Sequence, residues 1–323
     1  MKKSVAIISG GYSSEIIIAK KSAATIFENI DSELYEPYLV EITEQQWIVH
    51  IRGGQAKISK DDFTYELEGS KFHFDLAFIT IHGTPGEDGK LQAYFDMIGQ
   101  KYINSDCFAS ALTFNKWACN AFLRDFGIST AKAILLRDPN DVKPIQIADE
   151  LGFPCFVKPN DGGSSFGITK VKNLMEMPHA IANAFKEGNE VVIESFIEGR
   201  EITCGMYFNG KEVVALPLTE IITTNDFFDF DAKYNGESNE VTPADIDVQL
   251  ADKIKANSKN IYRRIGLRGI ARTDYLVTKT NEIFLIEVNT TPGMSAESIV
   301  PQQVNATDKN LKTVLTEIIS QSI

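Results

Sequence analysis

Short apolar runs alternate with segments of helical periodicity over the first hundred residues. Residues 5–9, 38–42 and 76–81 are largely apolar runs that predict buried strands, whereas residues 15–29 and 91–98 repeat apolar positions at the helical period. This alternation predicts a parallel α/β domain. Because such sheets bind ligands at the carboxyl ends of their strands, the glycine-rich segments that follow two of these strands are well placed for a site.

The rest of the chain mixes the same two patterns. From about residue 105 to residue 194 we predict helices at 116–126 and 177–187 and strands at 133–136, 153–158, 168–172 and 190–194. The last part is rich in strands at first, and then has a polar–aromatic insertion at about 221–244, a helix at 247–265, strands at 270–277 and 283–289, and a terminal helix at 309–319. The pattern and the length predict an α/β protein with three domains, residues 1–104, 105–194 and 195–323.

The two strands near the carboxyl end carry four polar residues in an apolar setting. Since side chains alternate between the faces of a strand, Arg272 shares a face with Asp274, and Glu287 shares one with Asn289. If residues 279–282 form the hairpin loop, Asp274 lies opposite Glu287 and Arg272 lies opposite Asn289. A two-residue turn would keep all four on one face, whereas a three-residue loop would separate them.

Two facing carboxylates in an apolar sheet repel each other and are costly to desolvate. A hard divalent cation removes this problem, since Mg²⁺ takes carboxylate and amide oxygens as ligands and leaves other positions to water and substrate phosphates. Arg272 beside them suits a phosphate or a developing oxyanion. The alternative is a salt-bridge cluster on a solvated sheet face, which is common in antiparallel sheets.

Composition narrows the range of partners. The 323 residues carry a net charge of −12, which argues against a general nucleic-acid binder. The amino-terminal apolar run is too short for a signal peptide and no apolar segment reaches the length of a membrane span, so we expect a cytoplasmic protein without a membrane partner. The widely spaced cysteines predict neither a zinc site nor a disulfide framework, and we expect all four to be small buried residues: Cys107, Cys119, Cys155 and Cys204.

A lysine and a glycine-rich segment follow a predicted strand in the middle of the chain. In residues 158–167, glycine backbone N–H groups and two serine hydroxyls can converge on an anion that Lys158 also reaches. The segment is not a Walker A loop, because no Gly-Lys-Ser/Thr follows the glycines, and an ordinary hairpin turn is the alternative. The strand at 190–194 leads into an acidic segment whose edge suits a heterocycle and whose Glu201 suits ribose hydroxyls, although taken alone an ordinary connection explains it better.

Three further segments have both a structural and a functional interpretation. Ser13, Ser14 and Glu15 can cap a helix, or Glu15 can hold a substrate ammonium at the end of a strand. Residues 82–89 place His, Glu and Asp around three glycines. A metal site is one interpretation, but we favour a tight loop whose polar side chains organise a pocket. The aromatic and charged residues 227–234 can form a mobile lid, or a loop packed by its own aromatic rings.

Six motifs in this order resemble those of the D-alanine–D-alanine ligases, which are members of the ATP-grasp family. They are Gly-Gly-Tyr-Ser-Ser-Glu at 10–15, His-Gly-Thr-Pro-Gly-Glu-Asp-Gly at 82–89, the segment 158–167, Ala-Lys-Tyr at 232–234, Arg-Thr-Asp at 272–274 and Glu-Val-Asn-Thr-Thr-Pro-Gly-Met-Ser at 287–295. One such motif is weak evidence, whereas six in order through nearly the whole chain are highly specific. The resemblance implies an ATP-grasp fold with an amino-terminal substrate-binding domain, a central ATP-grasp domain and a carboxyl-terminal catalytic domain with its lid at about 221–244.

The resemblance also implies a role for each matching residue. The implied ATP-binding residues are Lys116, Lys158, Ser164, Ser165, Gly167, Glu194, Ile197, Glu201 and Lys233. The residues implied to contact the two D-alanines or the reacting groups are Glu15, His82, Ser164, Tyr234, Arg272, Gly293, Ser298 and Ile299. The implied ligands of two Mg²⁺ ions, or of Mn²⁺, are Asp274, Glu287 and Asn289. Among the substrate residues, Glu15 would hold the first ammonium, and Ser298 and Ile299 the second carboxylate.

The reaction implied by the resemblance begins with a carboxylate, which is a poor electrophile. ATP converts the first D-alanine to an acyl phosphate, a step that needs in-line positioning and charge neutralisation by metal, Lys and Arg. The amine of the second D-alanine then displaces phosphate, under a lid that keeps water from the acyl phosphate. The implied partners are D-alanine and ATP. A homodimer, a monovalent cation as a further cofactor and a role in peptidoglycan synthesis follow from the resemblance alone.

Other functions fit the sequence less well. Relatives that make D-alanyl-D-lactate differ in the lid, and Tyr234 matches the dipeptide-forming version, so we expect D-alanine over D-lactate as the acceptor. Glu15, Tyr234 and Ser298 together disfavour an ATP-grasp ligase for another amino acid. A nucleotide-binding regulator that had lost catalysis would be expected to lack one of the four polar residues of the two strands near the carboxyl end. All four of these residues are present. An NAD-binding Rossmann protein is disfavoured, since the glycines at residues 10 and 11 lack the G-x-G-x-x-G spacing.

Overall fold

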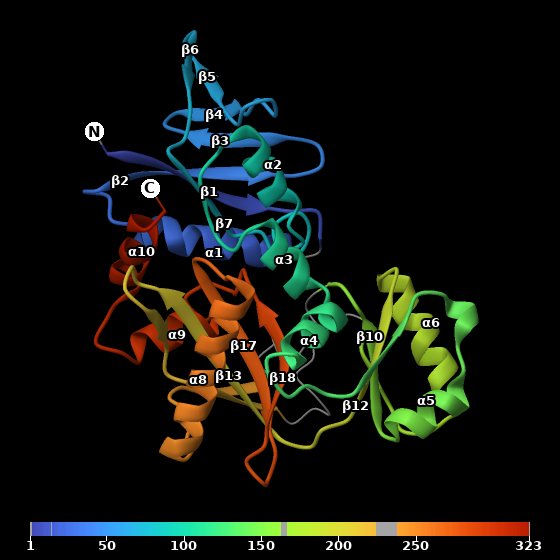
Figure 1. The fold of residues 1–323 in the computed structure, drawn as a ribbon. Helices are drawn as coiled ribbons and strands as arrows, with labels where there is room; N and C mark the ends of the chain where they lie inside the picture. Colours follow the sequence, from blue (N-terminus) through green and yellow to red (C-terminus); the bar gives the residue numbers. More distant parts are fainter. Residues whose placement is uncertain (1, 14, 163–166, 224–237, 323) are drawn as a thin grey trace.

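The computed structural model describes residues 2–13, 15–162, 167–223 and 238–322. Within this part of the chain, three main sheets follow one another along the sequence, each with helices packed on it (Figure 1).

The first sheet belongs to the amino-terminal part of the chain. Its order is β4-β3-β2-β1-β7-β8, formed by β1 (Lys3–Gly10), β2 (Tyr35–Ile42), β3 (Trp47–Ile51), β4 (Gly54–Lys57), β7 (Leu76–Ile79) and β8 (Tyr102–Ile103). The strands β2, β1, β7 and β8 are parallel, as predicted, and β3 and β4 add an antiparallel edge that the sequence analysis did not predict. Short turns after β2 and β3 allow hairpins, whereas a parallel neighbour would need a longer crossover.

Helices α1 (Ile16–Asn29) and α2 (Lys90–Ile98) make the crossovers between parallel strands, and β5 (Tyr65–Leu67) pairs with β6 (Ser70–Phe72) in a small separate hairpin. The buried residues Ala19, Ala23 and Ile26 lie three or four positions apart and so form one apolar stripe of α1. Ala23 and Ile26 share a core with Val5 and also with Leu315 of α10 (Leu311–Ser320). The last helix of the chain is therefore fastened to the first sheet.

The second sheet is antiparallel and lies on the right in Figure 1. Its order is β11 (Thr169–Val171), β10 (Cys155–Pro159), β12 (Val191–Ser195) and β9 (Ala133–Leu136), and the chain adds α3 (Cys107–Phe114), α4 (Lys116–Arg124), the short 3₁₀ helix η1 (Pro139–Asp141), α5 (Pro144–Leu151) and α6 (Met177–Glu187). Val157 and Ile193 pack with Ile147 and Ala180 of α5 and α6. By strand alternation, Lys158 therefore lies on the sheet face away from these helices.

The third sheet is also antiparallel. Its order is β16 (Ser238–Val241), β15 (Thr219–Thr223), β13 (Arg200–Phe208), β17 (Ile270–Val277) and β18 (Ile283–Asn289), and β14 (Val213–Ala215) pairs with β13. Helix α8 (Val248–Ile265) covers one face, beginning where Asp247 accepts hydrogen bonds from two backbone N–H groups and ending at left-handed Gly266. The short α9 (Ile299–Asn305) follows β18 and packs near β13.

The register of β17 with β18 is as predicted at the polar residues, although the predicted loop was wrong. Asp274 lies opposite Glu287 and Arg272 lies opposite Asn289, but Val277 already pairs with Ile283, so the loop has five residues. A β-bulge between these two sets of pairs restores the register. The bulge directs both Leu285 and Val288 into the core under α8, and keeps the polar residues together on the opposite face.

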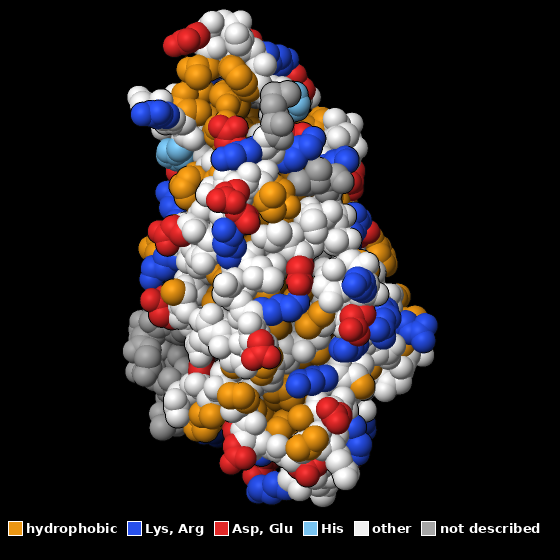
Figure 2. Space-filling model, turned by 90° about the vertical axis from the view of Figure 1, so that its left-hand side faces the viewer, with side chains coloured by type: hydrophobic (Ala, Val, Ile, Leu, Met, Phe, Trp, Pro, Cys, Tyr) orange, Lys and Arg blue, Asp and Glu red, His pale blue; other side chains and the backbone are white. Residues whose placement is uncertain are grey.

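The surface charges, the helices and the cysteines can each be compared with what the composition predicts. The face seen in Figure 2 carries Lys and Arg side chains among Asp and Glu rather than a patch of one sign. None of the helices in the described ranges combines the length and apolarity of a membrane span. Cys119, Cys155 and Cys204 are buried as predicted. Cys107, the first residue of α3, is only half-buried, because it is not on the buried face of that helix.

Candidate active site

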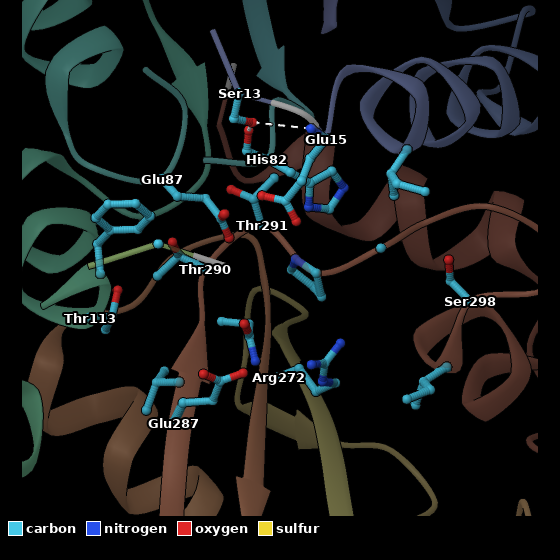
Figure 3. A pocket seen from close by; sticks show the side chains of 18 of the residues that line it. Ser13, Glu15, His82, Glu87, Thr113, Arg272, Glu287, Thr290, Thr291 and Ser298 are labelled. Carbon is cyan, nitrogen blue, oxygen red and sulfur yellow. Dashed lines mark hydrogen bonds between the residues drawn. The ribbon is translucent and has the colours of Figure 1, made fainter. Parts of the chain in front are cut away.

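A cavity of about 520 Å³ lies where residues from the three sheets meet. Ten of the predicted site residues line it: Glu15, His82, Lys116, Lys158, Arg272, Glu287, Asn289, Gly293, Ser298 and Ile299. These residues come from distant parts of the sequence, so the fold itself brings them together. Figure 3 shows Glu15, His82 and Glu87 on one side of this space and Arg272 and Glu287 on another.

The remaining predicted residues fall into two groups. Gly167, Glu194, Ile197, Glu201 and Asp274 are described but do not line this cavity. Ser164, Ser165, Lys233 and Tyr234 lie outside the described residues, as does most of the predicted lid. The roles that the resemblance implies for Ser164 and Tyr234 therefore stay predictions.

Asp274 is the most heavily bonded carboxylate of the site. Arg272 donates to both of its oxygens, from Nε and Nη2, each at 2.8 Å. Thr203 donates its hydroxyl at 2.5 Å and Asn289 donates its Nδ2 at 2.9 Å. The side chain of Asp274 is only 5% exposed, so these hydrogen bonds, and not hydration, stabilise its charge.

Two lysines reach the cavity from different elements, β10 of the second sheet and helix α4. Lys158 forms an ion pair with Glu194 at 2.7 Å, and both side chains are about nine-tenths buried. Glu194 lies on the neighbouring strand, two positions from the pairing partner of Lys158, so the two side chains share a face. Lys116, at the start of α4, donates to the carbonyl oxygen of Gly162 at 2.6 Å. Both lysines thus flank the glycine-rich segment.

The loops after β1 and β7 support each other. The hydroxyl of Ser13 donates to the carbonyl oxygen of His82 at 3.1 Å and accepts the N–H of Glu15 at 3.3 Å, the contact dashed in Figure 3. Glu87 accepts the N–H of Gly83 at 2.7 Å, and Asp88 accepts the hydroxyl of Thr84. This arrangement confirms the tight, polar loop predicted for residues 82–89.

Two ionisable groups on these loops have displaced pKa values. Burial, and secondly the positive charge of Arg272, lower the pKa of His82 to about 4, so the imidazole is neutral near pH 7. Burial raises the pKa of Glu87 to about 8, and the negative charges of Glu15 and Glu287 add to the effect. Displacements of this size are common where a site binds or transforms charged ligands.

The segment after β18 is held by close contacts. A side chain at Gly293 would meet the hydroxyl of Ser298, since a Cβ built there lies 2.8 Å from Oγ. The next residue, Met294, donates its N–H to Ser22 of α1 at 3.1 Å, and Ser22 also lies 3.5 Å from Nε2 of His82. Ser22 therefore joins this segment to the first part of the chain.

The donor set suits a hard divalent cation in part. Glu287 and Asn289 both line the cavity and offer oxygen ligands, and Glu15 and Glu287 contribute, after burial, to the raised pKa of nearby Glu87. Asp274 differs, because Arg272 and Asn289 already bond its oxygens. Among the described residues, no cluster of three or more His, Cys, Asp and Glu side chains is placed to hold a metal. The fit rests on one carboxylate and one amide, with the remaining ligands left to substrate and water.

The sequence analysis did not single out three residues of this neighbourhood. Thr203 and Ser22 each bond a predicted site element, and Glu240 of β16 lines the cavity. Thr203 and Glu240 lie on strands whose register the chain alone does not give, and Ser22 lies within an ordinary helical repeat. We find no signal in the sequence that distinguishes them.

Comparison with known proteins defines the class. The family model for the carboxyl-terminal part of D-Ala–D-Ala ligases matches residues 122–320, and the model for the amino-terminal part matches residues 4–105. The chain is 50% identical over 324 aligned positions to the D-alanine–D-alanine ligase of Parabacteroides distasonis, covering 100% of this chain and 98% of that protein. It is 46% identical to the D-alanine–D-alanine ligase of Bacteroides fragilis strain ATCC 25285, with 99% of both chains covered.

Solved structures agree with this result. The D-Ala:D-Ser ligase VanG of Enterococcus faecalis matches with a TM-score of 0.91 at 29% identity, covering 100% of both chains. The D-alanine–D-alanine ligase of Bacillus anthracis complexed with ATP matches with a TM-score of 0.79 at 26% identity, over 98% of this chain and 96% of that one. Fold and site define an ATP-dependent ligase of the ATP-grasp class. The chain belongs to the D-alanine–D-alanine ligase family.

Proposed function

We propose that this protein joins two D-alanines into D-alanyl-D-alanine at the expense of ATP, releasing ADP and phosphate, and that the dipeptide serves peptidoglycan synthesis. The observation that carries the proposal is the single cavity lined by Lys116 and Lys158 on one side, Arg272 on another and Glu15 with His82 on a third. Cations suited to phosphate thus face groups suited to a small amino acid across one cavity.

The chain's own groups account for the first half of the reaction. Lys116, Lys158 and Arg272 neutralise the phosphates and the charge that develops as the donor carboxylate attacks. Glu15 holds the donor ammonium, beside a neutral His82 that adds no competing positive charge. Arg272 and the backbone of Gly293 stabilise the tetrahedral oxyanion of the second half.

Some of the residues predicted to bind ATP lie next to the cavity and do not line it. The second oxygen of Glu194 is buried and has no hydrogen-bond partner among the described residues, which supports a ligand donor such as an adenine amino group there. Ile197 and Glu201 follow on the same segment and would contact the nucleoside, and Gly167 closes the glycine-rich segment over the phosphates. Ser164, Ser165 and Lys233 complete the predicted set.

A divalent cation, Mg²⁺ or Mn²⁺, would be held by Glu287 and Asn289, with Asp274 as the further predicted ligand. When bound, it would neutralise phosphate oxygens of ATP. The remaining finer proposals come from the family resemblance: a second metal ion, a monovalent cation, a homodimer, the three domains 1–104, 105–194 and 195–323, and residence in the cytoplasm, where ATP and D-alanine meet.

The acceptor is D-alanine in this proposal, with its carboxylate at Ser298 and Ile299, and Tyr234 favours it over D-lactate. The test is phosphate release from ATP and Mg²⁺ with D-alanine, L-alanine, or D-alanine mixed with D-lactate or D-serine, with products identified by mass. Phosphate release matched by D-alanyl-D-alanine, with D-alanine alone and not with L-alanine, is the expected result. Predominant ester or D-alanyl-D-serine from the mixtures would refute the acceptor assignment, and no turnover despite ATP binding would refute the function.

A further inference from the structure

A carboxylate outside every motif of the sequence reaches the cavity from the third sheet. Glu240 pairs with Ile221 of β15, which pairs with Glu201 of β13, and Glu201 lies an even number of residues from Thr203. Residues directly paired across antiparallel strands share a face, so Glu240 lies on the face that carries Asp274 and Arg272. It is half-buried and lines the cavity.

Helix α9 holds this carboxylate in place. Nε2 of Gln302 donates to Oε2 of Glu240 at 2.6 Å, and the same nitrogen donates to the carbonyl oxygen of Glu297 at 2.8 Å. Gln302 lies four residues after Ser298 and three after Ile299, so all three lie on one side of the helix. Glu240 therefore stands next to the place proposed for the acceptor carboxylate.

The second oxygen of Glu240 has no hydrogen-bond partner within the described ranges. Burial raises the pKa of Glu240, while the hydrogen bond from Gln302 and the charge of Arg272 act in the opposite direction. A partly desolvated carboxylate with an open oxygen is a good acceptor for an ammonium and for its proton.

In an α-amino acid, the carboxylate and the ammonium are attached to the same carbon. An acceptor bound by its carboxylate at Ser298 and Ile299 thus places its ammonium within a short distance of that point, in the cavity that Glu240 and Arg272 both line. The ammonium has no lone pair, so one proton must leave before nitrogen can attack.

We propose that Glu240 is a catalytic residue of the second half-reaction, which binds the acceptor ammonium and removes its proton. One N–H bond breaks and the proton passes to the open oxygen of Glu240. The nitrogen lone pair forms the C–N bond, and the C–O bond to phosphate breaks with its electron pair on phosphate. A second proton then leaves the nitrogen for solvent, which gives the neutral amide. This inference rests on the proposed function, since it assigns a residue to that reaction.

The competing explanation is structural, because Glu240 could merely anchor Gln302 and α9. The variant Glu240→Gln separates the two, since a glutamine keeps an oxygen that accepts from Gln302 but neither carries a charge nor takes a proton at neutral pH. Glu220→Gln is the matched control. Glu220 lies on β15, paired with Val241 and hence on the opposite face, where it accepts hydrogen bonds from exposed Arg200 at 2.6 and 2.7 Å.

The experiment uses the full chain with ATP, Mg²⁺ and saturating D-alanine, with and without hydroxylamine. Hydroxylamine is largely unprotonated near neutral pH, so it traps the acyl phosphate as a hydroxamate without needing a base. For Glu240→Gln we expect dipeptide formation to fall roughly 100-fold, while hydroxamate formation stays within about twofold of wild type. Glu220→Gln should leave both rates unchanged.

The remaining outcomes overturn the proposal. An equal fall in both products would mean that Glu240 only maintains the structure of the site. No fall in either product would mean that Glu240 has no role in the reaction. In a parallel series at limiting D-alanine, a fall in dipeptide that disappears at saturating D-alanine limits Glu240 to binding and refutes proton transfer. Failure of the proposed function itself is distinct, since the wild-type enzyme would then give neither dipeptide nor hydroxamate.

Discussion

The hairpin and the loop that border the cavity carry carboxylates in opposite electrostatic states. On the hairpin wall, formed by β17 and β18, Asp274 receives hydrogen bonds from Arg272, Asn289 and Thr203, so neighbouring side chains balance its charge. On the loop wall, formed by residues 82–89, Glu87 has a pKa of about 8 because burial and other carboxylates disfavour its charge. The charge on the hairpin wall is compensated by its own neighbouring side chains, whereas the charged form of Glu87 on the loop wall is disfavoured.

The difference indicates which ligands each wall expects. On the hairpin wall, the guanidinium of Arg272 is already held by Asp274, so it can bind a phosphate without a large rearrangement. On the loop wall, burial and the nearby charges of Glu15 and Glu287 disfavour the charged form of Glu87, so a cation such as a substrate ammonium or a metal ion would stabilise that form. We therefore expect changes on the hairpin wall to lower stability and activity together, and neutralising changes on the loop wall to raise stability.

The largest effect should follow Asp274→Asn. The variant keeps the size of the side chain but leaves Arg272 without its anionic partner, so the arginine loses its orientation. We expect kcat for phosphate release to fall roughly 10²- to 10³-fold, as when a fixed transition-state donor is removed. Asp252→Asn on the exposed face of α8 is the control and should have no effect. A fall of less than about tenfold would contradict the view that the pair fixes Arg272 for catalysis.

The buried pair of Lys158 and Glu194 gives the next largest effect. Lys158→Met leaves a carboxylate buried without a cation, which should lower the free energy of unfolding by about 3–5 kcal/mol in urea titrations. The double variant Lys158→Met with Glu194→Met should regain most of that stability, because two apolar groups replace two desolvated charges. It should not regain activity, since one of the three cations that line the cavity, Lys158 beside Lys116 and Arg272, is then missing.

An exposed ion pair is the control for this comparison. Lys279 and Glu198 lie 2.7 Å apart, but their side chains are 84% and 70% exposed, so Lys279→Met should leave stability unchanged. If the double variant at Lys158 and Glu194 were as unstable as the single one, desolvation would not be the cause of the loss.

The sequence predicted the hairpin wall for a reason that lies in local geometry. Alternation along a strand depends on the chain alone, so Arg272 with Asp274 and Glu287 with Asn289 followed directly from their spacing. The loop between the strands was wrong, because a bulge depends on how Leu285 and Val288 both pack under α8. The pairing was predicted correctly although its stated basis was not.

Contacts between distant segments were beyond the sequence. Ser22 meets Met294 across 272 positions, and Glu240 meets Gln302 across 62, and no local pattern predicts either contact. Likewise, the antiparallel strands β3 and β4 at the edge of the first sheet follow from short turns whose preference the apolar pattern does not reveal. Motif resemblance predicted which residues contact substrates, and the three-dimensional structure was needed to find those that hold the predicted residues in place.

The smallest effect we predict concerns Glu87 and has the opposite sign. Its pKa in the folded protein is about 8, above the ordinary value of 4.5, so the folded state binds more protons than the unfolded chain between these values. The stability that wild type has below pH 4.5 is therefore lost as pH rises through about 8. Glu87→Gln removes this loss and still accepts the N–H of Gly83.

Chemical denaturation at pH 5 and pH 9 checks the sign. Glu87→Gln should gain on the order of 1–3 kcal/mol over wild type at the higher pH, and much less at the lower, since Glu87 keeps some exposure to the cavity. Glu66→Gln on the exposed strand β5 should show no such pH-dependent gain. A difference from wild type that is constant with pH would mean that Glu87 ionises normally. The loop wall would then be as well balanced as the hairpin wall, and the cations we assign to it would have no electrostatic role there.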